Sequence, residues 1–301
     1  MASSRNIRLT LAYDGTNYCG WQVQSNGPSI QAALERGIER LTGERSPVFS
    51  AGRTDSGVHA LGQVANFHTQ SSIPASNFRS ALQTKLPEDI VLLDACEAPP
   101  EFHATFSAIK KQYRYVIDNS PVSLPFLKRF AWQLRRELEA QAMHRAAQWL
   151  LGRHDFRSFE TDWPNKVTSV RTVLEISVTR RPMWELWEPD RQPIVSPPVG
   201  GEPAARAAPG VPFSPGIPIP SPSPTPGPSD VNASAPLICL DITADGFLYN
   251  MVRSIVGTLV NVGRGKWPAT QVVEILNAQK RCVAGSTAPP QGLYLVQVWY
   301  P

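Results

Sequence analysis

Long hydrophobic runs are missing from this chain of 301 residues. No stretch approaches the about 18 consecutive apolar residues that a membrane-spanning helix requires. The first residues, Met1 to Asn6, also lack the apolar segment of a secretory signal peptide. These absences argue against a membrane protein and a secreted precursor. We expect a soluble, cytoplasmic protein with no membrane partner.

Cysteine is scarce, and the four cysteines are far apart: Cys19, Cys96, Cys239 and Cys282. None forms the C-x-x-C pair that is typical of zinc sites and redox motifs. The histidines also lack metal-ligand spacing: His59, His68, His103, His144 and His154. We therefore expect reduced, buried thiols and no bound metal.

Several catalytic signatures are absent as well. The sequence contains no Walker A loop, no G-x-G-x-x-G fingerprint, no G-x-S-x-G elbow and no H-E-x-x-H motif. Nucleotide hydrolysis, dinucleotide-dependent oxidoreduction, serine hydrolysis and zinc proteolysis consequently have no support. We expect no cofactor.

The composition is that of a folded protein. Hydrophobic residues make up 42% of the chain, which is enough for a substantial core. The formal net charge of +4 is mildly basic. This balance suits a nucleic-acid partner, although many soluble enzymes share it.

The first part of the chain mixes strand and helix patterns. Strict alternation over Ile7–Asp14 predicts a half-buried strand. Ser29 can cap a helix that Gly43 ends. Further elements are expected at Gln63–His68 (strand), Ser76–Leu86 (helix) and Lys110–Asp118 (strand).

The second part repeats this mixture. Its expected elements are helices at Leu138–Leu151 and Phe247–Val262, and strands at Val170–Val178, Leu237–Thr243 and Tyr294–Trp299. Alternation in the first of these strands places Val170, Thr172, Leu174, Ile176 and Val178 on one face. We predict an α+β fold of two similar halves, residues 1–109 and 110–301, with helices packed on mainly antiparallel sheets.

Proline interrupts the second half. Residues 181–236 contain 16 of the 29 prolines, a density that neither a helix interior nor a sheet ladder accepts. We predict a disordered, extended insert at about 181–236. A docking site for a partner that binds proline motifs is the alternative.

The segment Ala51–Val64 carries an arginine, a threonine and an aspartate between two glycines, which core packing does not require. Gly52 and Gly57 permit a tight turn or a close approach to a ligand. The spacing of Arg53 and Asp55 permits an ion pair that keeps the carboxylate ionised. For so short a polar segment, a capped surface turn is the alternative.

The whole string resembles the active-site segment of the TruA-type tRNA pseudouridine synthases. Further blocks resemble the same family, in the family's order: Tyr13–Gln22, Phe102–Ala108, Lys111–Tyr115, Met143–Phe156, Phe247–Gly257 and Gly292–Leu295. The resemblance implies two joined sheets with a catalytic cleft between the halves, and a homodimer whose two subunits both contact the tRNA. The implied reaction isomerises uridines 38, 39 and 40 of the anticodon stem-loop, with no metal or cofactor.

The resemblance also implies roles for individual residues. Asp55 matches the family's essential aspartate, and Tyr113 matches its active-site tyrosine, which can stack on a flipped uracil. Arg53 would pair with Asp55 or hold the flipped nucleotide out of the stack. Arg253 lies in an otherwise apolar stretch, so it needs a carboxylate or phosphate partner, and Asp55 is the candidate.

The neighbours of Tyr113 allow two interpretations. Lys110, Lys111 and Arg114 either contact phosphates or form a solvated strand face. Tyr113 itself, without the resemblance, is a buried strand tyrosine. One departure from the family pattern is Lys85, where an asparagine is common, and it concerns local RNA contacts.

Two other functions remain open. A non-catalytic RNA-binding protein could retain the fold, but binding RNA does not require an acid in the pocket. A glycosidase could use paired carboxylates, for instance Asp14 and Asp55, and would release free base or sugar.

Overall fold

One mixed sheet organises the protein, and the computed structural model describes residues 4–161, 168–183 and 235–301. Its ten strands have the order β4-β1-β3-β10-β5-β9-β8-β7, with β2 beside β3 and β6 beside β5. The strands are β1 (Arg5–Tyr13), β2 (Phe49–Ser50), β3 (His59–Thr69), β4 (Ile90–Ala98), β5 (Lys110–Asp118), β6 (Trp132–Gln133), β7 (Gly152–Asp155), β8 (Val170–Arg181), β9 (Leu237–Ala244) and β10 (Leu293–Trp299). Only the β3–β10 and β5–β6 pairs are parallel in this described sheet, so the expectation of a mainly antiparallel sheet is confirmed.

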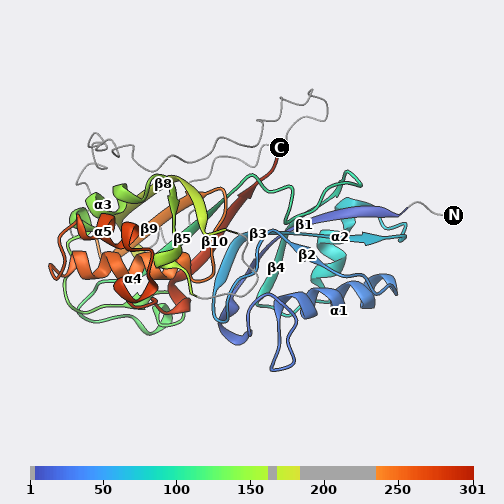
Figure 1. Ribbon diagram of the computed structural model, residues 1–301. Helices are drawn as coiled ribbons and strands as arrows, with labels where there is room; N and C mark the ends of the chain where they lie inside the picture. Colours follow the sequence, from blue (N-terminus) through green and yellow to red (C-terminus); the bar gives the residue numbers. More distant parts are fainter. Residues whose placement is uncertain (1–3, 162–167, 184–234) are drawn as a thin grey trace.

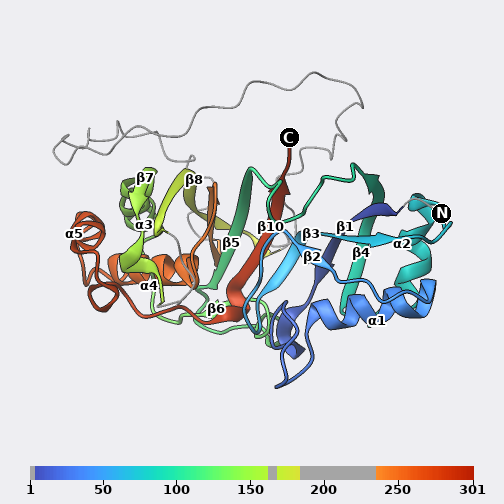
Figure 2. The ribbon, with the colours of Figure 1, turned by 45° about the vertical axis from the view of Figure 1, so that its right-hand side comes forward.

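The last strand joins the two halves. β10 lies between β3 and β5, antiparallel to β5 along its length and parallel to β3 through Tyr294↔His59 and Leu295↔Ala60. Figures 1 and 2 show this red strand at the centre of the molecule, between the blue and green parts of the sheet. The two sheets implied by the resemblance are therefore one continuous sheet.

Helices accompany both parts of the sheet. The five that the described residues form are α1 (Ile30–Thr42), α2 (Ala75–Gln83), α3 (Ala140–Ala147), α4 (Met251–Gly263) and α5 (Gln271–Ala278). α1 and α2 lie with the N-terminal strands, and α3, α4 and α5 lie with the C-terminal strands (Figures 1 and 2). No helix in the described ranges is both long and apolar enough to cross a bilayer.

The ends of α1 follow the predicted chemistry. The Ser29 hydroxyl accepts a hydrogen bond from the Ala32 amide at 3.2 Å. Gly43 ends the helix in the left-handed region, at φ 77°, which glycine adopts without strain. Both boundaries are confirmed because they depend on local capping.

The predicted start of α4 is wrong by four residues. The expected helix begins at Phe247, whereas α4 begins at Met251. Asn250 stands just before it with φ 60°, a left-handed conformation that cannot continue a right-handed helix. As a result Arg253 lies in the first turn of α4 rather than in a helix interior.

The predicted face of β8 is also wrong at its centre. Leu174, expected on the apolar face, is 47% exposed, and Val173 is buried instead. The register shifts between Val173 and Glu175, which marks a β-bulge that reverses the alternation. Ile176 and Val178 are buried as expected.

Other elements differ from the sequence-based expectation in extent. The helix expected at Leu138–Leu151 is shorter, α3 followed by a 3-10 turn at Gln148–Leu150. β4, α5 and the short strands β2, β6 and β7 were not predicted. The main hydrophobic core includes residues from both sides of residue 109, such as Leu9, Leu34, Ile242 and Ile255. The core therefore does not divide the chain there, and the boundary proposed at residue 109 stays a prediction.

Residues 184–234 of the proline-rich insert predicted at about 181–236 lie outside the described residues. Its flanks belong to the sheet: Arg181 pairs with Leu237 at the ends of β8 and β9. Arg180 also donates from Nη1 to the Ala235 carbonyl at 2.9 Å. Residues 184–234 therefore connect two adjacent antiparallel strands.

We expect that replacing residues 184–234 with a short glycine-containing turn will preserve the fold. Closing the shorter loop costs roughly 2 kcal/mol less chain entropy, so the free energy of unfolding should stay equal or rise. Urea denaturation measures this. A wider deletion that includes Pro236 is the comparison, because the Pro236 carbonyl accepts from the Asn119 amide at 2.9 Å and its loss should destabilise. Unfolding of the shorter deletion protein would contradict the prediction.

Candidate active site

The Asp55 loop, residues 51–58, connects β2 to β3, and several backbone bonds hold it. The Ala51 amide donates to the Val64 carbonyl at 2.8 Å, and the Val58 amide donates to the Asp55 carbonyl at 3.1 Å. Gly57 has φ 76°, which the turn requires. The loop is thus anchored at both ends.

The segment after β1 supports the same loop from one side. The Trp21 amide donates to the Thr54 carbonyl at 2.9 Å, and the Tyr13 hydroxyl lies 2.8 Å from the Thr54 hydroxyl. A β-carbon at Gly20 would lie 2.6 Å from the Thr54 carbonyl oxygen, and φ there is +95°. Only glycine fits this approach, which explains why the block around Tyr13–Gln22 accompanies the Asp55 string.

Two polar side chains support the loop from the sheet. Gln63 donates from Nε2 to the Gly52 carbonyl at 2.8 Å. Lys111 donates from Nζ to the Ala51 carbonyl at 2.5 Å. Sequence reasoning gave neither residue this role. The signal for Gln63 was its place within the Asp55 string.

Asp55 forms an ion pair with Arg253 from the other half of the chain. Arg253 Nη1 lies 3.2 Å from Asp55 Oδ2, and the two side chains are 16% and 27% exposed. Arg253 is itself held by Nε donating to the Ala288 carbonyl at 2.7 Å and by Nη1 donating to Asn250 Oδ1 at 2.7 Å. The predicted contact between Arg253 and Asp55 is confirmed.

Burial and charge oppose each other at Asp55. Burial raises the pKa of the Asp55 carboxyl above its ordinary value, and the charge and hydrogen bond of Arg253 lower the pKa in part. A carboxylate at neutral pH is consequently less well stabilised than in water. A carboxyl group with a pKa raised in this way is typical of candidate nucleophiles and bases in active sites.

Arg53 does not pair with Asp55. Its side chain is exposed, whereas that of the following Thr54 is buried, so the turn directs the arginine outward. No ion pair joins Arg53 to Asp55 in the described part of the chain, where the aspartate pairs with Arg253. The pairing predicted from their spacing is wrong. Contact with a ligand remains the alternative for Arg53.

Tyr113 on β5 faces the same loop. It is 7% exposed, and its ring meets Phe247 edge-on at 4.8 Å. Its hydroxyl would lie 3.9 Å from a β-carbon at Gly52, and it donates to no described residue. Tyr115, by contrast, donates its hydroxyl to the Pro289 carbonyl at 2.7 Å. Tyr113 is the tyrosine whose hydroxyl stays available beside Asp55.

The Tyr113 hydroxyl is protonated at neutral pH. Burial raises its pKa well above the ordinary value, and nearby Tyr13 and Asp55 raise it further. A protonated phenol can donate a hydrogen bond, or accept one proton while it passes another on.

The basic residues around Tyr113 lie in different environments. Arg114 is 1% exposed and its Nε lies 2.7 Å from Asp241 Oδ1, so the prediction of a phosphate contact or a solvated face is wrong for this residue. β5 lies between β10 and β9 in the sheet, and its residues from Tyr113 to Asp118 are buried. Lys110 lies over the Trp299 ring at 4.7 Å, and Lys111 reaches the Asp55 loop.

Known proteins match this chain along almost its full length. The family model described as tRNA pseudouridine synthase matches residues 10–107 and 146–301. The chain belongs to the tRNA pseudouridine synthase family. Proteins named tRNA pseudouridine synthase A from Acetivibrio thermocellus and Moorella thermoacetica are 39% and 38% identical to it over 296 residues each. Those alignments cover 98% of this chain, and 100% and 99% of the two relatives.

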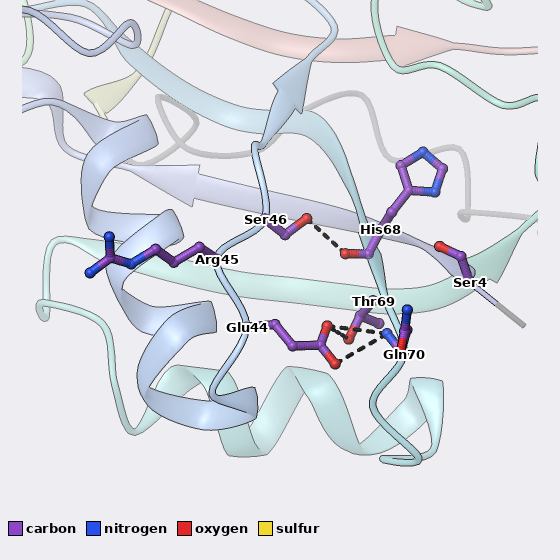
Figure 3. A pocket seen from close by; sticks show the side chains of 7 residues that line it. All are labelled: Ser4, Glu44, Arg45, Ser46, His68, Thr69 and Gln70. Atoms are coloured by element: carbon purple, nitrogen blue, oxygen red, sulfur yellow. Dashed lines mark hydrogen bonds between the residues drawn. The ribbon is translucent and has the colours of Figure 1, made fainter. Parts of the chain in front are cut away.

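Figure 3 shows a surface hollow on this synthase. Its lining residues come from the N-terminus, the loop after α1 and the end of β3: Ser4, Glu44, Arg45, Ser46, His68, Thr69 and Gln70. Glu44 accepts from the Thr69 hydroxyl at 2.6 Å, and the Ser46 hydroxyl donates to the His68 carbonyl at 2.7 Å. These hydrogen bonds join lining groups to one another, and Asp55, Tyr113 and Arg253 are not among the lining residues. The catalytic cleft between the halves stays a prediction.

Asp14, the carboxylate that a glycosidase would pair with Asp55, is held by other groups. Asp14 accepts from the Thr16 hydroxyl at 2.6 Å and also pairs with Arg129. These partners lower the pKa of Asp14 despite its burial. A carboxyl group held ionised in this way is unsuited to the role of the general acid.

Proposed function

We propose that this protein isomerises uridine to pseudouridine at positions 38, 39 and 40 in the anticodon stem and loop of tRNAs. The ion pair that joins Asp55 to Arg253 across the two halves carries this proposal, at 3.2 Å. Only the folded chain brings the two residues together, because Asp55 lies in the loop between β2 and β3 and Arg253 lies on α4. Membership of the synthase family supports the substrate class.

The reaction breaks the N1–C1′ bond of uridine, turns the base and forms a C5–C1′ bond, while C5 loses a proton and N1 gains one. Asp55 is the catalytic carboxylate beside the sugar, where positive charge or a covalent bond develops. Arg253 orients this carboxylate and keeps it ionised. Arg53, exposed on the same loop, holds the flipped nucleotide out of the stack, and Tyr113 stacks on its base.

The proposal includes a cytoplasmic homodimer in which one tRNA contacts both subunits. A non-catalytic RNA-binding protein with this fold is the alternative. It is disfavoured because RNA binding gains nothing from a half-buried carboxylate whose pKa is raised.

Release of tritium tests the proposal. Purified protein is incubated with tRNA labelled with tritium at uridine C5, and each isomerisation liberates one label into water. We expect release that saturates at a few uridines per tRNA, with no free uracil. Binding without release would support the RNA-binding alternative, and free base would support a glycosidase.

Activity should persist in a chelator. The reaction is redox-neutral, and Asp55 with Arg253 supplies the charge that it needs. A tRNA folded before addition of the chelator should lose its tritium at an unchanged rate. A rate that falls together with loss of a stoichiometric protein-bound metal would contradict this expectation.

Tyr113→Phe should bind tRNA nearly normally but turn over slowly, because the ring remains and the hydroxyl is lost. Tyr113→Ala should also weaken binding, by about 1–3 kcal/mol for a lost stacking contact. Filter binding and single-turnover tritium release separate the two effects. Tyr115→Phe is the matched control, since the Tyr115 hydroxyl is engaged with the Pro289 carbonyl. Equal rates for Tyr113→Phe and the unsubstituted protein would leave Tyr113 as a stacking platform alone.

A further inference from the structure

Two cations meet at the end of β9. In the order β5-β9-β8, Lys111 of β5 and Val173 of β8 both pair with Ala244, the last residue of β9. Arg171 precedes Val173 on β8 and extends past this end. Lys111 and Arg171 therefore flank the point where β9 stops.

Neither cation has a carboxylate partner among the described residues. Lys111 uses one donor on the Ala51 carbonyl, at 2.5 Å, so two of its three donors remain. Arg171 uses Nη1 on the carbonyls of Thr168 and Val170, at 2.9 and 2.6 Å, which leaves Nη2 and Nε. The nearby Asp245 accepts instead from the Thr172 amide, at 2.9 Å.

The two cations repel each other in the free protein. Burial, and then the charge of Arg171, lower the pKa of Lys111 to about 8. A pair of like charges without a counterion is unfavourable, and a bound anion would relieve the repulsion.

Both side chains lie close against a glycine, where a larger residue would crowd them. A β-carbon at Gly52 would lie 3.3 Å from Lys111 Nζ, and one at Gly246 would lie 3.2 Å from Arg171 Nε. Gly52 belongs to the Asp55 loop, and Gly246 precedes Phe247, which packs on Tyr113. The two cations therefore lie beside residues of the candidate active site that come from both halves of the chain.

We propose that Lys111 and Arg171 together bind one phosphodiester group of the RNA strand next to the uridine that reaches Asp55. This inference rests on the proposed function for the identity of the strand. Lys111 then links the Asp55 loop to the substrate backbone, because the same ammonium group holds the Ala51 carbonyl. It is a binding and positioning residue, and Arg171 supplies the second set of donors.

A chemical double-mutant cycle tests the pair. Binding is measured in the Asp55→Asn background, so that no turnover is needed. The tRNAs carry one neutral methylphosphonate, placed in turn on either side of uridines 38, 39 and 40. Protein variants are Arg171→Met and Lys111→Met, and Lys266→Met is the matched control on an exposed lysine beyond α4.

We expect Arg171→Met to weaken binding of unmodified tRNA about tenfold, as for one charge-assisted contact. At one phosphate position the methylphosphonate should weaken binding to the parent protein by a similar factor and cause no further loss in Arg171→Met. Lys111→Met should show the same coupling, and Lys111→Arg should restore affinity. Lys266→Met should show no coupling at any position.

Additive effects at every position, for both variants, would overturn the proposal. Loss of affinity in Lys111→Met alone, with additive effects in Arg171→Met, would make Lys111 a support of the loop and would also overturn it. Tritium release by the unsubstituted protein is scored separately. Coupling without release contradicts the proposed function and not the phosphate site, and release without coupling contradicts only the phosphate site.

Discussion

Replacing Asp55 with asparagine should reduce turnover at least about a thousandfold, which corresponds to about 4 kcal/mol of barrier. The side chain changes from a carboxylate to an uncharged amide of the same shape, so the loop should persist. Its anchors, the Trp21–Thr54 bond and the Gln63 contact to Gly52, do not involve the carboxylate. Affinity for tRNA should change little, because phosphate contacts dominate it.

Single-turnover tritium release at saturating tRNA measures this effect. Glu39→Gln is the matched control: it also removes a carboxylate from an arginine pair, with Arg45 at 2.7 Å, but on the exposed face of α1. The control should retain full activity. If Asp55→Asn keeps activity within tenfold, Asp55 is not the catalytic carboxylate.

The same substitution should not destabilise the fold at neutral pH. The pKa of Asp55 is raised in the folded state, so ionisation of Asp55 lowers the free energy of unfolding. This loss of stability is absent below the ordinary pKa of an aspartate in the unfolded chain, where the group is protonated in both states. Asparagine removes the cost. Urea denaturation should therefore find Asp55→Asn equally or more stable at neutral pH, with the difference shrinking as pH falls and Asp55 protonates.

Arg253→Met should produce the second large effect, a loss of about a hundredfold in turnover. Arg253 lowers the pKa of Asp55 and orients its carboxylate, so its removal raises that pKa further. Activity requires the ionised form, and the acid limb of the pH–rate profile should move to higher pH. Arg253→Lys keeps the charge, so it should restore the position of the acid limb more fully than the rate. Lysine lacks the Nε–H that donates to the Ala288 carbonyl and holds the arginine in place.

Arg45→Met is the control for this substitution, since it breaks an exposed arginine pair. Its pH–rate profile should match that of the unsubstituted protein. An unshifted acid limb in Arg253→Met would show that Arg253 does not set the charge state of Asp55. Its role would then be confined to the packing of α4 against the loop.

Local signals in the sequence were sufficient for much of the fold. The alternation at Ile7–Asp14 and Lys110–Asp118, and the caps Ser29 and Gly43, predicted β1, β5 and α1. These features depend on periodicity and on hydrogen bonds between residues close in the chain. Asp55, Tyr113 and Arg253 were identified through resemblance, and the structure brings all three to one loop.

The remaining features depend on contacts between distant residues, which no local pattern encodes. The β-bulge that exposes Leu174 belongs to the pairing of β8 with β9, whose register shifts there. The left-handed Asn250 sets the start of α4 and thereby directs Arg253 toward a loop 198 positions earlier in the chain. Arg114 looks like a surface cation in sequence, but β5 becomes central once β9 and β10 cover its edges, and Asp241 of β9 then neutralises it. Lys111 and Arg171 likewise become neighbours because β9 ends between them. Composition and periodicity specify strands and helices, whereas the order of strands in the sheet determines which charges meet.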